Sequence, residues 1–254
     1  TSALVAMLIY VGSLKIREYG KTNLKLDIPK TGKLFLKVSY YSTNETALVP
    51  EGHLLGFDQI ALENEDASVA LVTKMDDKFG KSTNPIHVEE NDCNVIVAGE
   101  KFRYVLDKRN GLFVSMERNG KAVIERPMDI NIWRAPTDND RYLQYEWKRA
   151  GYNRSYARCY ETTVEKGTSE IAIHCTMSMA ADAVQKSMDI NTTWSIDGDG
   201  TLSLRMHVKM NPDFMMFPRF GIRMFLNKEM NQVSYYGLGP VESYCDKRRA
   251  ASYG

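Results

Sequence analysis

The chain has 254 residues, and its 33 Lys and Arg residues against 32 Asp and Glu residues give a formal net charge of +1 at pH 7. Basic and acidic residues are interspersed from end to end, which argues against nucleic acid or an anionic membrane as a partner. Hydrophobic residues make up 43% and charged residues 26%, so disordered and collagen-like classes are excluded. The length suits one or two domains.

The longest apolar run covers residues 4–11 and is far shorter than the roughly 20 residues of a membrane-spanning helix. It favours a strand, and no basic segment precedes it, so no signal peptide is predicted. Thr1 is not an initiator methionine, and we therefore expect the chain to be a piece of a longer protein. The N-terminus does not determine a compartment.

Apolar and polar residues alternate in four stretches, as they do in strands with one buried face. These stretches are residues 34–40, 102–106, 171–179 and 202–210. In the strictest of them, the residues expected to face inward are Leu202, Leu204, Met206, Val208 and Met210. A shift of register by one residue would bury Arg205 and Lys209 instead.

Hairpin turns are predicted where Asn or Asp precedes Gly, because tight primed turns need positive φ angles. The clearest are Asn110 with Gly111, Asn119 with Gly120, and residues 197–200. Strands at this spacing favour antiparallel sandwiches over an α/β fold. The fold class is therefore predicted to be all-β, with a smaller sandwich followed by a larger one and a boundary within residues 81–92.

One short helix is predicted near the middle of the chain. Leu143, Trp147 and Ala150 lie on one helical face, and Gly151 follows them as a residue suited to ending a helix.

Common catalytic and metal-binding patterns are missing from the sequence. No G-x-S-x-G elbow, H-E-x-x-H zinc motif or C-x-x-C pair is present. Gly237 to Pro240 lacks the third glycine of a phosphate loop, and residues 197–200 lack the Glu that closes a calcium loop. The four cysteines are predicted to be free thiols, and they are Cys93, Cys159, Cys175 and Cys245.

The stretch richest in chemistry is residues 133–140. Arg134, Asp138, Asn139 and Asp140 stand there beside Trp133. In the structural interpretation, Asp138 and Asn139 cap turns and Arg134 pairs with a carboxylate. In the functional interpretation, the polar groups and the aromatic ring hold a sugar. The residues alone favour the structural interpretation and leave the other open.

The sequence of residues 133–140, followed about a hundred residues later by that of residues 236–247, resembles the C-terminal small-chain domain of the family-2 β-galactosidases. The family writes these motifs R-A-P-x-D-N-D and G-x-G-P-x-E-x-Y-x-D-R, and here Ser243 and Lys247 replace the commoner Asn and Arg. Residues 102–125 resemble the opening of that domain, and residues 52–62 resemble the end of the domain before it. The resemblance spans about residues 30–254.

The resemblance implies an immunoglobulin-like β-sandwich over residues 1–88, expected to lack its first strand or strands. It further implies that residues 89–254 form the N-terminal part of a truncated galactose-mutarotase-like β-supersandwich. The two motifs are expected to lie near each other, with Arg134, Asp138 or Asp140, and Glu242 in contact.

The resemblance also implies a parent enzyme that hydrolyses terminal β-galactosides with retention, using two Glu residues on a TIM barrel that this chain does not contain. The isolated chain is therefore expected to be inactive, to hold no catalytic residue and no cofactor, and to support the barrel and the other domains. The parent family often uses Mg and Na in its catalytic region and often forms homo-oligomers. A bacterial cytoplasm or periplasm would fit equally well.

The residues considered for a sugar or interface contact are Trp133, Arg134, Asp138, Asn139, Asp140, Glu242 and Tyr244. The alternative to a scaffold is a free-standing carbohydrate-binding or interaction module that uses the 133–140 loop. A mutarotase-type enzyme would need a catalytic Glu, for which Glu242 is the candidate, and paired His residues that no motif places.

Overall fold

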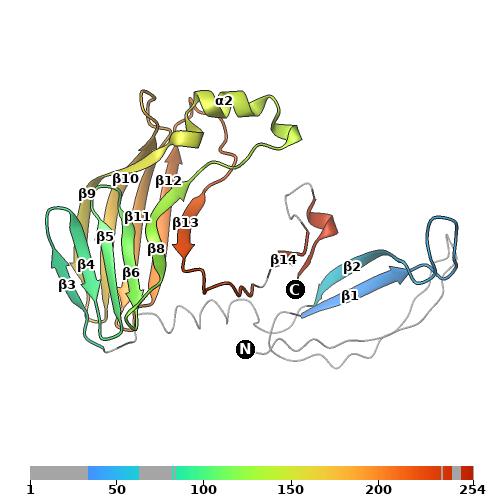
Figure 1. Ribbon diagram of the computed structural model, residues 1–254, viewed down its shortest axis with the longest axis horizontal. Helices are drawn as coiled ribbons and strands as arrows, with labels where there is room; N and C mark the ends of the chain where they lie inside the picture. The colour runs from blue at the N-terminus through green and yellow to red at the C-terminus, as the bar shows by residue number, and fades with distance from the viewer. Residues whose placement is uncertain (1–33, 63–81, 83, 236, 242–246, 254) are drawn as a thin grey trace. The chain divides into compact units, whose positions relative to one another are not determined.

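The computed structural model describes residues 34–62, 82, 84–235, 237–241 and 247–253. The chain divides into two compact units, Asp76–Val233 and a second unit made of Thr1–Met75 together with Ser234–Gly254. Antiparallel strands dominate the described part of each unit, and the one α-helix within the described ranges is α2 (Leu143–Arg149) (Figure 1). The prediction of an all-β fold is confirmed. The assignment of residues 1–88 and 89–254 to two named domains stays a prediction.

The larger unit is a sandwich of antiparallel sheets, whose two layers are seen at the left of Figure 1. One sheet has the order β3-β4-β5-β6-β7 and contains β3 (His87–Glu90), β4 (Asn94–Ala98), β5 (Phe102–Asp107), β6 (Leu112–Arg118) and β7 (Lys121–Ala122). The other has the order β12-β11-β10-β9 and contains β9 (Tyr156–Lys166), β10 (Glu170–Ala180), β11 (Met188–Asp197) and β12 (Leu202–Met210). A third pair joins β8 (Ile124–Asn131) to β13 (Gly221–Leu226).

The core lies between the two larger sheets, because both contribute fully buried side chains to one cluster. Val97 and Phe113 come from the first sheet, and Ile173 and Ile190 from the second, and all four are 0% exposed. Trp194 joins the layers, since its indole Nε1 donates a hydrogen bond to the Gly111 carbonyl at 3.1 Å. Buried apolar area of this extent is the main stabilising contribution in such a domain.

The predicted alternation describes β10 and β12 of the second sheet well, with two exceptions. Leu204 on β12 packs against the core while its neighbours Ser203 and Arg205 are exposed. Met210 was expected to face inward but is 41% exposed, because it ends an edge strand that has no further strand beside it within the described part of the chain. On β10, Ser178 lies on the polar parity yet is 2% exposed.

All three predicted turns are present, but only Asn119–Gly120 has the expected pair of positive φ angles; at the other two turns only Gly111 and Gly200 have positive φ. Asn119 and Gly120 have φ angles of 51° and 71°, as a primed hairpin turn requires. At the β11–β12 turn, the Asp197 carboxylate accepts hydrogen bonds from the N–H groups of Asp199 and Thr201 at 3.0 and 2.9 Å. Residues 197–200 therefore form a turn in which Asp197 stabilises the backbone.

The smaller unit contains β1 (Leu34–Tyr41), β2 (Leu54–Leu62), β14 (Leu238–Gly239) and β15 (Ser252–Tyr253). Strands β1 and β2 form an antiparallel hairpin, and β14 pairs with β15. Tyr40 was placed on the buried parity of its strand but is 48% exposed, and its hydroxyl donates to Asp58 on β2 at 2.7 Å. Residues 4–11, predicted as a strand, lie outside the described residues.

Candidate functional site

The 133–140 loop leaves the sandwich at the end of β8, where Asn131 fixes its direction. The Asn131 side chain donates to the Trp133 carbonyl at 2.9 Å and accepts from the Trp133 N–H at 3.2 Å. Asn131 is 9% exposed, so one buried carboxamide satisfies both polar groups of the Trp133 backbone. The loop therefore begins from a rigid position.

Arg134 and Asp140 form a two-pronged ion pair across the loop. Arg134 Nη1 lies 2.7 Å from Asp140 Oδ2, and Arg134 Nη2 donates to Asp140 Oδ1 at 3.0 Å. The side chains are 19% and 8% exposed, which places the pair largely out of water. A bidentate guanidinium–carboxylate pair is both strong and directional, so it closes the loop on itself.

Thr137 completes the surroundings of the Asp140 carboxylate. Its backbone N–H and its hydroxyl donate to Asp140 Oδ2 at 2.8 and 3.1 Å. These bonds, led by that from the Thr137 N–H and joined by the Arg134 guanidinium, hold the pKa of Asp140 below its usual range although burial opposes them. Asp140 is therefore an anion in neutral solution.

Two aromatic rings pack beside the ion pair. Trp147, on α2, is 2% exposed and meets the Trp133 ring edge-on at 6.4 Å between centroids. The Arg134 guanidinium carbon lies 5.7 Å from the centroid of the Trp147 ring, within the range of a cation–π contact. The short helix thus packs its one buried side chain against the loop.

Two buried donors in this cluster have no acceptor among the residues that the structure describes. They are Arg134 Nε and the indole Nε1 of Trp147. A buried donor without a partner is unfavourable, and an ordered water or an acceptor from another molecule would satisfy it. Among the buried side-chain donors of the cluster, these two N–H groups are therefore the ones left without a partner within the described ranges.

The remaining predicted site residues separate into two groups. Asp138 and Asn139 are exposed, and their side chains form no hydrogen bond with any other described residue. Glu242 and Tyr244 lie outside the described residues. The predicted proximity of residues 134–140 to residues 237–246 joins parts of two different units and stays a prediction.

Thr137 and Trp147 belong to the cluster but were not among the predicted site residues. Thr137 had a readable signal, since Thr-x-x-Asp is a pattern in which the two residues bond reciprocally at a helix start. A short 3-10 helix does begin there, at Asp138–Asp140. Trp147 was predicted only as part of the apolar face of the helix.

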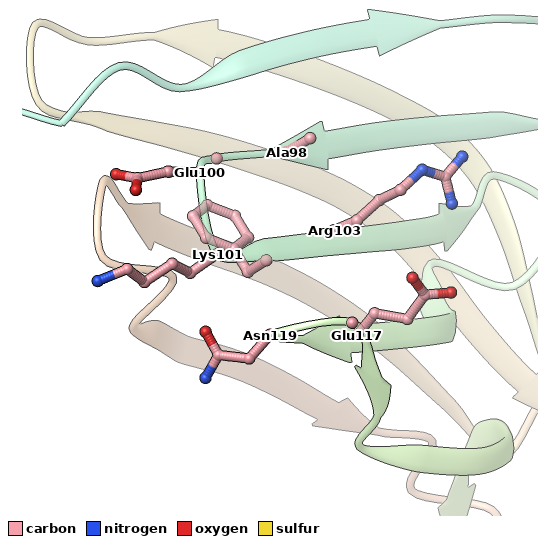
Figure 2. A pocket seen from close by; sticks show the side chains of 9 residues that line it. Ala98, Glu100, Lys101, Arg103, Glu117 and Asn119 are labelled. Atoms are coloured by element: carbon pink, nitrogen blue, oxygen red, sulfur yellow. The ribbon is translucent and has the colours of Figure 1, made fainter.

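A second candidate is an open groove of about 370 Å³ at the β4–β5 and β6–β7 turns (Figure 2). It shares no residue with the 133–140 loop and is lined by Ala98, Gly99, Glu100, Lys101, Phe102, Arg103, Glu117, Asn119 and Gly120. Figure 2 shows the charged ends of Glu100 and Lys101 on one side and those of Arg103 and Glu117 on the opposite side, rather than converging on one point. Ligand sites usually have converging polar groups, and this groove does not.

Comparison with known proteins identifies the domain. The family model described as "Beta galactosidase small chain" matches residues 98–254, which is more than half of the chain. The chain belongs to the β-galactosidase small-chain family. The 133–140 loop and its supporting helix lie inside the matched region of this family member.

This family member is also similar to curated proteins named β-galactosidase. It is 34% identical to that of Actinobacillus pleuropneumoniae over 246 residues, which covers 95% of this chain and 24% of that protein. It is 29% identical to that of Staphylococcus xylosus over 78% of this chain and 19% of that protein. It is 25% identical to the β-galactosidase of Pseudoalteromonas haloplanktis, over 85% of this chain and 22% of that protein. The chain thus spans about a quarter or less of each relative.

Within the described part of the chain, no three His, Cys, Asp or Glu side chains gather as metal ligands. Of the helices that could be traced, none has the length and hydrophobicity to cross a bilayer.

Proposed function

We propose that this chain is a non-catalytic domain of a β-galactosidase-type enzyme that hydrolyses terminal β-galactosides with retention. Two findings support the proposal: the match to the small-chain family and the similarity to whole proteins named β-galactosidase, of which the chain spans a quarter or less. In this proposal the domain supports a catalytic barrel and neighbouring domains, and it meets the substrate only through the assembled enzyme. A homo-oligomeric enzyme is part of the same expectation.

The engagement of Asp140 is the observation that carries the non-catalytic assignment. Retaining hydrolysis needs one carboxyl group that gives up a proton and a second that attacks the sugar, about 5 to 5.5 Å apart. We expect Asp140 to do neither, because its low pKa leaves it no proton to give in neutral solution, and Arg134 and Thr137 occupy the oxygens with which it would attack. Its part is to fasten the loop.

Cofactor chemistry plays no part in the proposed role of this chain. If the enzyme uses Mg and Na, we propose that the ions bind in its catalytic region.

The direct test is turnover of a chromogenic β-galactoside by the purified 254-residue chain. We expect hydrolysis no faster than in buffer, with the Actinobacillus pleuropneumoniae β-galactosidase assayed alongside as a positive control. Activity that survives purification and is lost in Asp140→Asn or Asp138→Asn would contradict the proposal.

A chimera tests the scaffolding role itself. The matching quarter of the Actinobacillus pleuropneumoniae enzyme would be replaced by this chain, which is 34% identical over 246 residues. We expect the chimera to fold and to hydrolyse a β-galactoside. In the chimera, Asp140→Asn should lower the thermal midpoint and leave KM nearly unchanged. The exposed control Asp138→Asn should change neither quantity. A folded chimera without activity would count against the proposal.

Sugar binding at the loop is the second candidate, and one observation favours it. Asp138 and Asn139 are exposed, and Tyr142, two residues beyond the loop, is 79% exposed. An open ring beside polar side chains is a common sugar-binding arrangement. Titration with galactose, followed by NMR of amides in the loop, tests it. Saturable shifts that vanish in Asp138→Ala with Asn139→Ala would establish this function, and unchanged spectra would exclude it for galactose.

A further inference from the structure

Cys159 and Cys175 lie on neighbouring strands, with both side chains on the core-facing side of the sheet. In the β9–β10 ladder, Cys175 is opposite Thr162 and Met177 is opposite Cys159. The register shifts between these two pairs, which leaves Tyr160 without an opposite residue on β10. A bulge of this kind bends the strand and re-aims the side chains beside it. Cys159 and Cys175 are therefore diagonal neighbours at a bulge.

The hydroxyl group of Thr162 contacts both sulfur atoms. Its Oγ1 lies 3.4 Å from Cys159 Sγ and 4.0 Å from Cys175 Sγ. Cys159 Sγ also donates to the Glu161 carbonyl at 3.1 Å in its protonated form. Both sulfurs are thus held against the same side chain, on strands that are already paired.

The two thiols differ in accessibility and in acidity. Cys175 is 2% exposed, whereas Cys159 is only partly buried. The neighbouring thiol is the largest influence on each pKa, and it lowers the pKa of Cys159 and raises the pKa of Cys175. The reachable sulfur is accordingly the better nucleophile, and the buried sulfur keeps its proton.

We propose that Cys159 and Cys175 form an oxidisable dithiol that closes to a cross-strand disulfide when the protein meets a hydroperoxide. This site is independent of the proposed function, since it uses neither the 133–140 loop nor any sugar-binding group. Both sulfurs lie against Thr162 Oγ1 on paired strands, and forming the bond requires them to approach to about 2 Å by an adjustment of the strands at the bulge.

The reaction balances in two steps with hydrogen peroxide as the oxidant. The Cys159 thiolate attacks one peroxide oxygen, which breaks the O–O bond and gives a sulfenic acid and hydroxide. The Cys175 sulfur then attacks the sulfenic sulfur, an S–S bond forms, and the S–O bond breaks. The released hydroxide takes up a proton, so two thiols and one peroxide give one disulfide and two molecules of water.

Cys93 provides an internal control. It is exposed, is a free thiol, and lies outside β9 and β10, next to the first residue of β4. An accessible thiol without a neighbouring sulfur can be oxidised but cannot close an internal bridge. Oxidation of Cys93 by peroxide therefore reports general thiol reactivity, which can be distinguished from disulfide formation between Cys159 and Cys175.

Peptide mapping tests the proposal directly. The native chain is treated with hydrogen peroxide, then unfolded, alkylated without reduction, and digested with trypsin. Cleavage after Arg158, Lys166 and Lys186 places Cys159 and Cys175 on separate peptides, residues 159–166 and 167–186. We expect these two peptides joined, with a mass lower than their sum by two hydrogen atoms, and separated again by dithiothreitol.

Three variants complete the test. Cys93→Ser should still form the bridge, whereas Cys159→Ser and Cys175→Ser should not. The thermal midpoint of the oxidised chain should rise in the wild type and in Cys93→Ser and return after reduction, because a bridge between β9 and β10 restricts the unfolded chain. Cys159 found as a sulfinic acid while Cys175 remains alkylated, or a bridge found only between two chains, would overturn the proposal. The wild-type map decides the question even if a variant fails to fold.

Discussion

Gln59 and Tyr253 stand 194 residues apart in the sequence and exchange two hydrogen bonds through one carboxamide. Gln59 Nε2 donates to the Tyr253 carbonyl at 3.0 Å, and the Tyr253 N–H donates to Gln59 Oε1 at 2.6 Å. The Phe35 ring stacks on the Tyr253 ring with their centroids 5.0 Å apart. Strand β15 is thereby held against the β1–β2 hairpin of the same unit.

Replacing Gln59 by Leu should release β15 from the hairpin. Two hydrogen bonds are lost, each with a net value of about 1 kcal/mol, so the local opening free energy should fall by roughly 1–2 kcal/mol. Hydrogen exchange at the Tyr253 amide should become several-fold faster. Ile60→Ala, at a neighbouring position that is 52% exposed, should leave the exchange rate unchanged. Equal rates in Gln59→Leu and the wild type would contradict this account.

Breaking the buried pair by Asp140→Asn should destabilise the larger unit by about 3 kcal/mol, because the Arg134 charge is left without its partner. The exposed control Asp138→Asn should change the free energy of unfolding by less than about 0.5 kcal/mol. Urea denaturation followed by tryptophan fluorescence measures both. Two variants of equal stability would show that the pair does not hold the loop.

The same pair predicts a dependence on acid. The pKa of Asp140 is lower in the folded chain than its usual value of 3.8. The unfolded chain therefore binds the proton first as the pH falls, so the contribution is present above pH 3.8 and is lost below it. The stability gap between the wild type and Asp140→Asn should consequently narrow as the pH is lowered from 5 through about 3.

Gly111 should tolerate a side chain less well than Gly120. Both have positive φ angles, 69° and 71°, but a Cβ at Gly111 would lie 2.8 Å from Met177 Sδ, whereas the space at Gly120 is open. Gly120→Ala should cost about 1 kcal/mol for backbone strain, and Gly111→Ala roughly 2–3 kcal/mol for strain and overpacking. Chemical denaturation of both variants gives the difference, and equal losses would exclude the clash.

Tyr152 should make the fold sensitive to alkali. Its hydroxyl donates to the Met215 carbonyl at 2.6 Å, and burial raises the pKa of Tyr152 from 10.0 to about 12. A raised pKa means that the stabilising contribution is complete below pH 10 and is lost as the pH rises towards 12. Tyr152→Phe should remove this part of the alkaline loss while costing about 1 kcal/mol at neutral pH. If the wild type and Tyr152→Phe lose stability identically as the pH rises from 10 to 12, this prediction is wrong.

Much of the fold could be predicted because its signals are local. The Asn119–Gly120 turn could be predicted from two residues. The helix that ends before Gly151, whose φ is 78°, could be predicted from one apolar face and one glycine. Inward parity on β10 followed from alternation alone. These features depend on neighbours in the sequence, which a reader of the sequence can see.

The features that escaped prediction depend on partners far along the chain. Ser178 is buried, and its Oγ lies 2.8 Å from the hydroxyl of Tyr160, the residue at the bulge of β9. The position of a bulge depends on how two strands pair, and no residue of β10 alone predicts it. The pairing of β8 with β13, joined by Arg223 and Asp129, was equally invisible.

In the candidate site the sequence suggested that Arg134 pairs with a carboxylate, and that part of the structural interpretation is confirmed by Asp140. The capping roles expected for Asp138 and Asn139 are not formed by their side chains, and Thr137 bonds to Asp140 instead. The position of Trp147 beneath Arg134 could not be foreseen, because it depends on the direction in which α2 packs.

The two Asn–Gly turns have different prospects during storage. An asparagine before glycine loses ammonia when the glycine nitrogen attacks the side-chain carbonyl, and such residues limit the lifetime of warm proteins. At Asn110 the attack is hindered, since its Oδ1 accepts from the Leu112 N–H at 3.0 Å and the Gly111 N–H donates to Asp107 at 2.8 Å. Asn119 is exposed and its side chain has no such partner in the described structure. Isoaspartate should therefore accumulate first at Asn119. The extent of deamidation in the β6–β7 turn should increase with the storage time of a preparation.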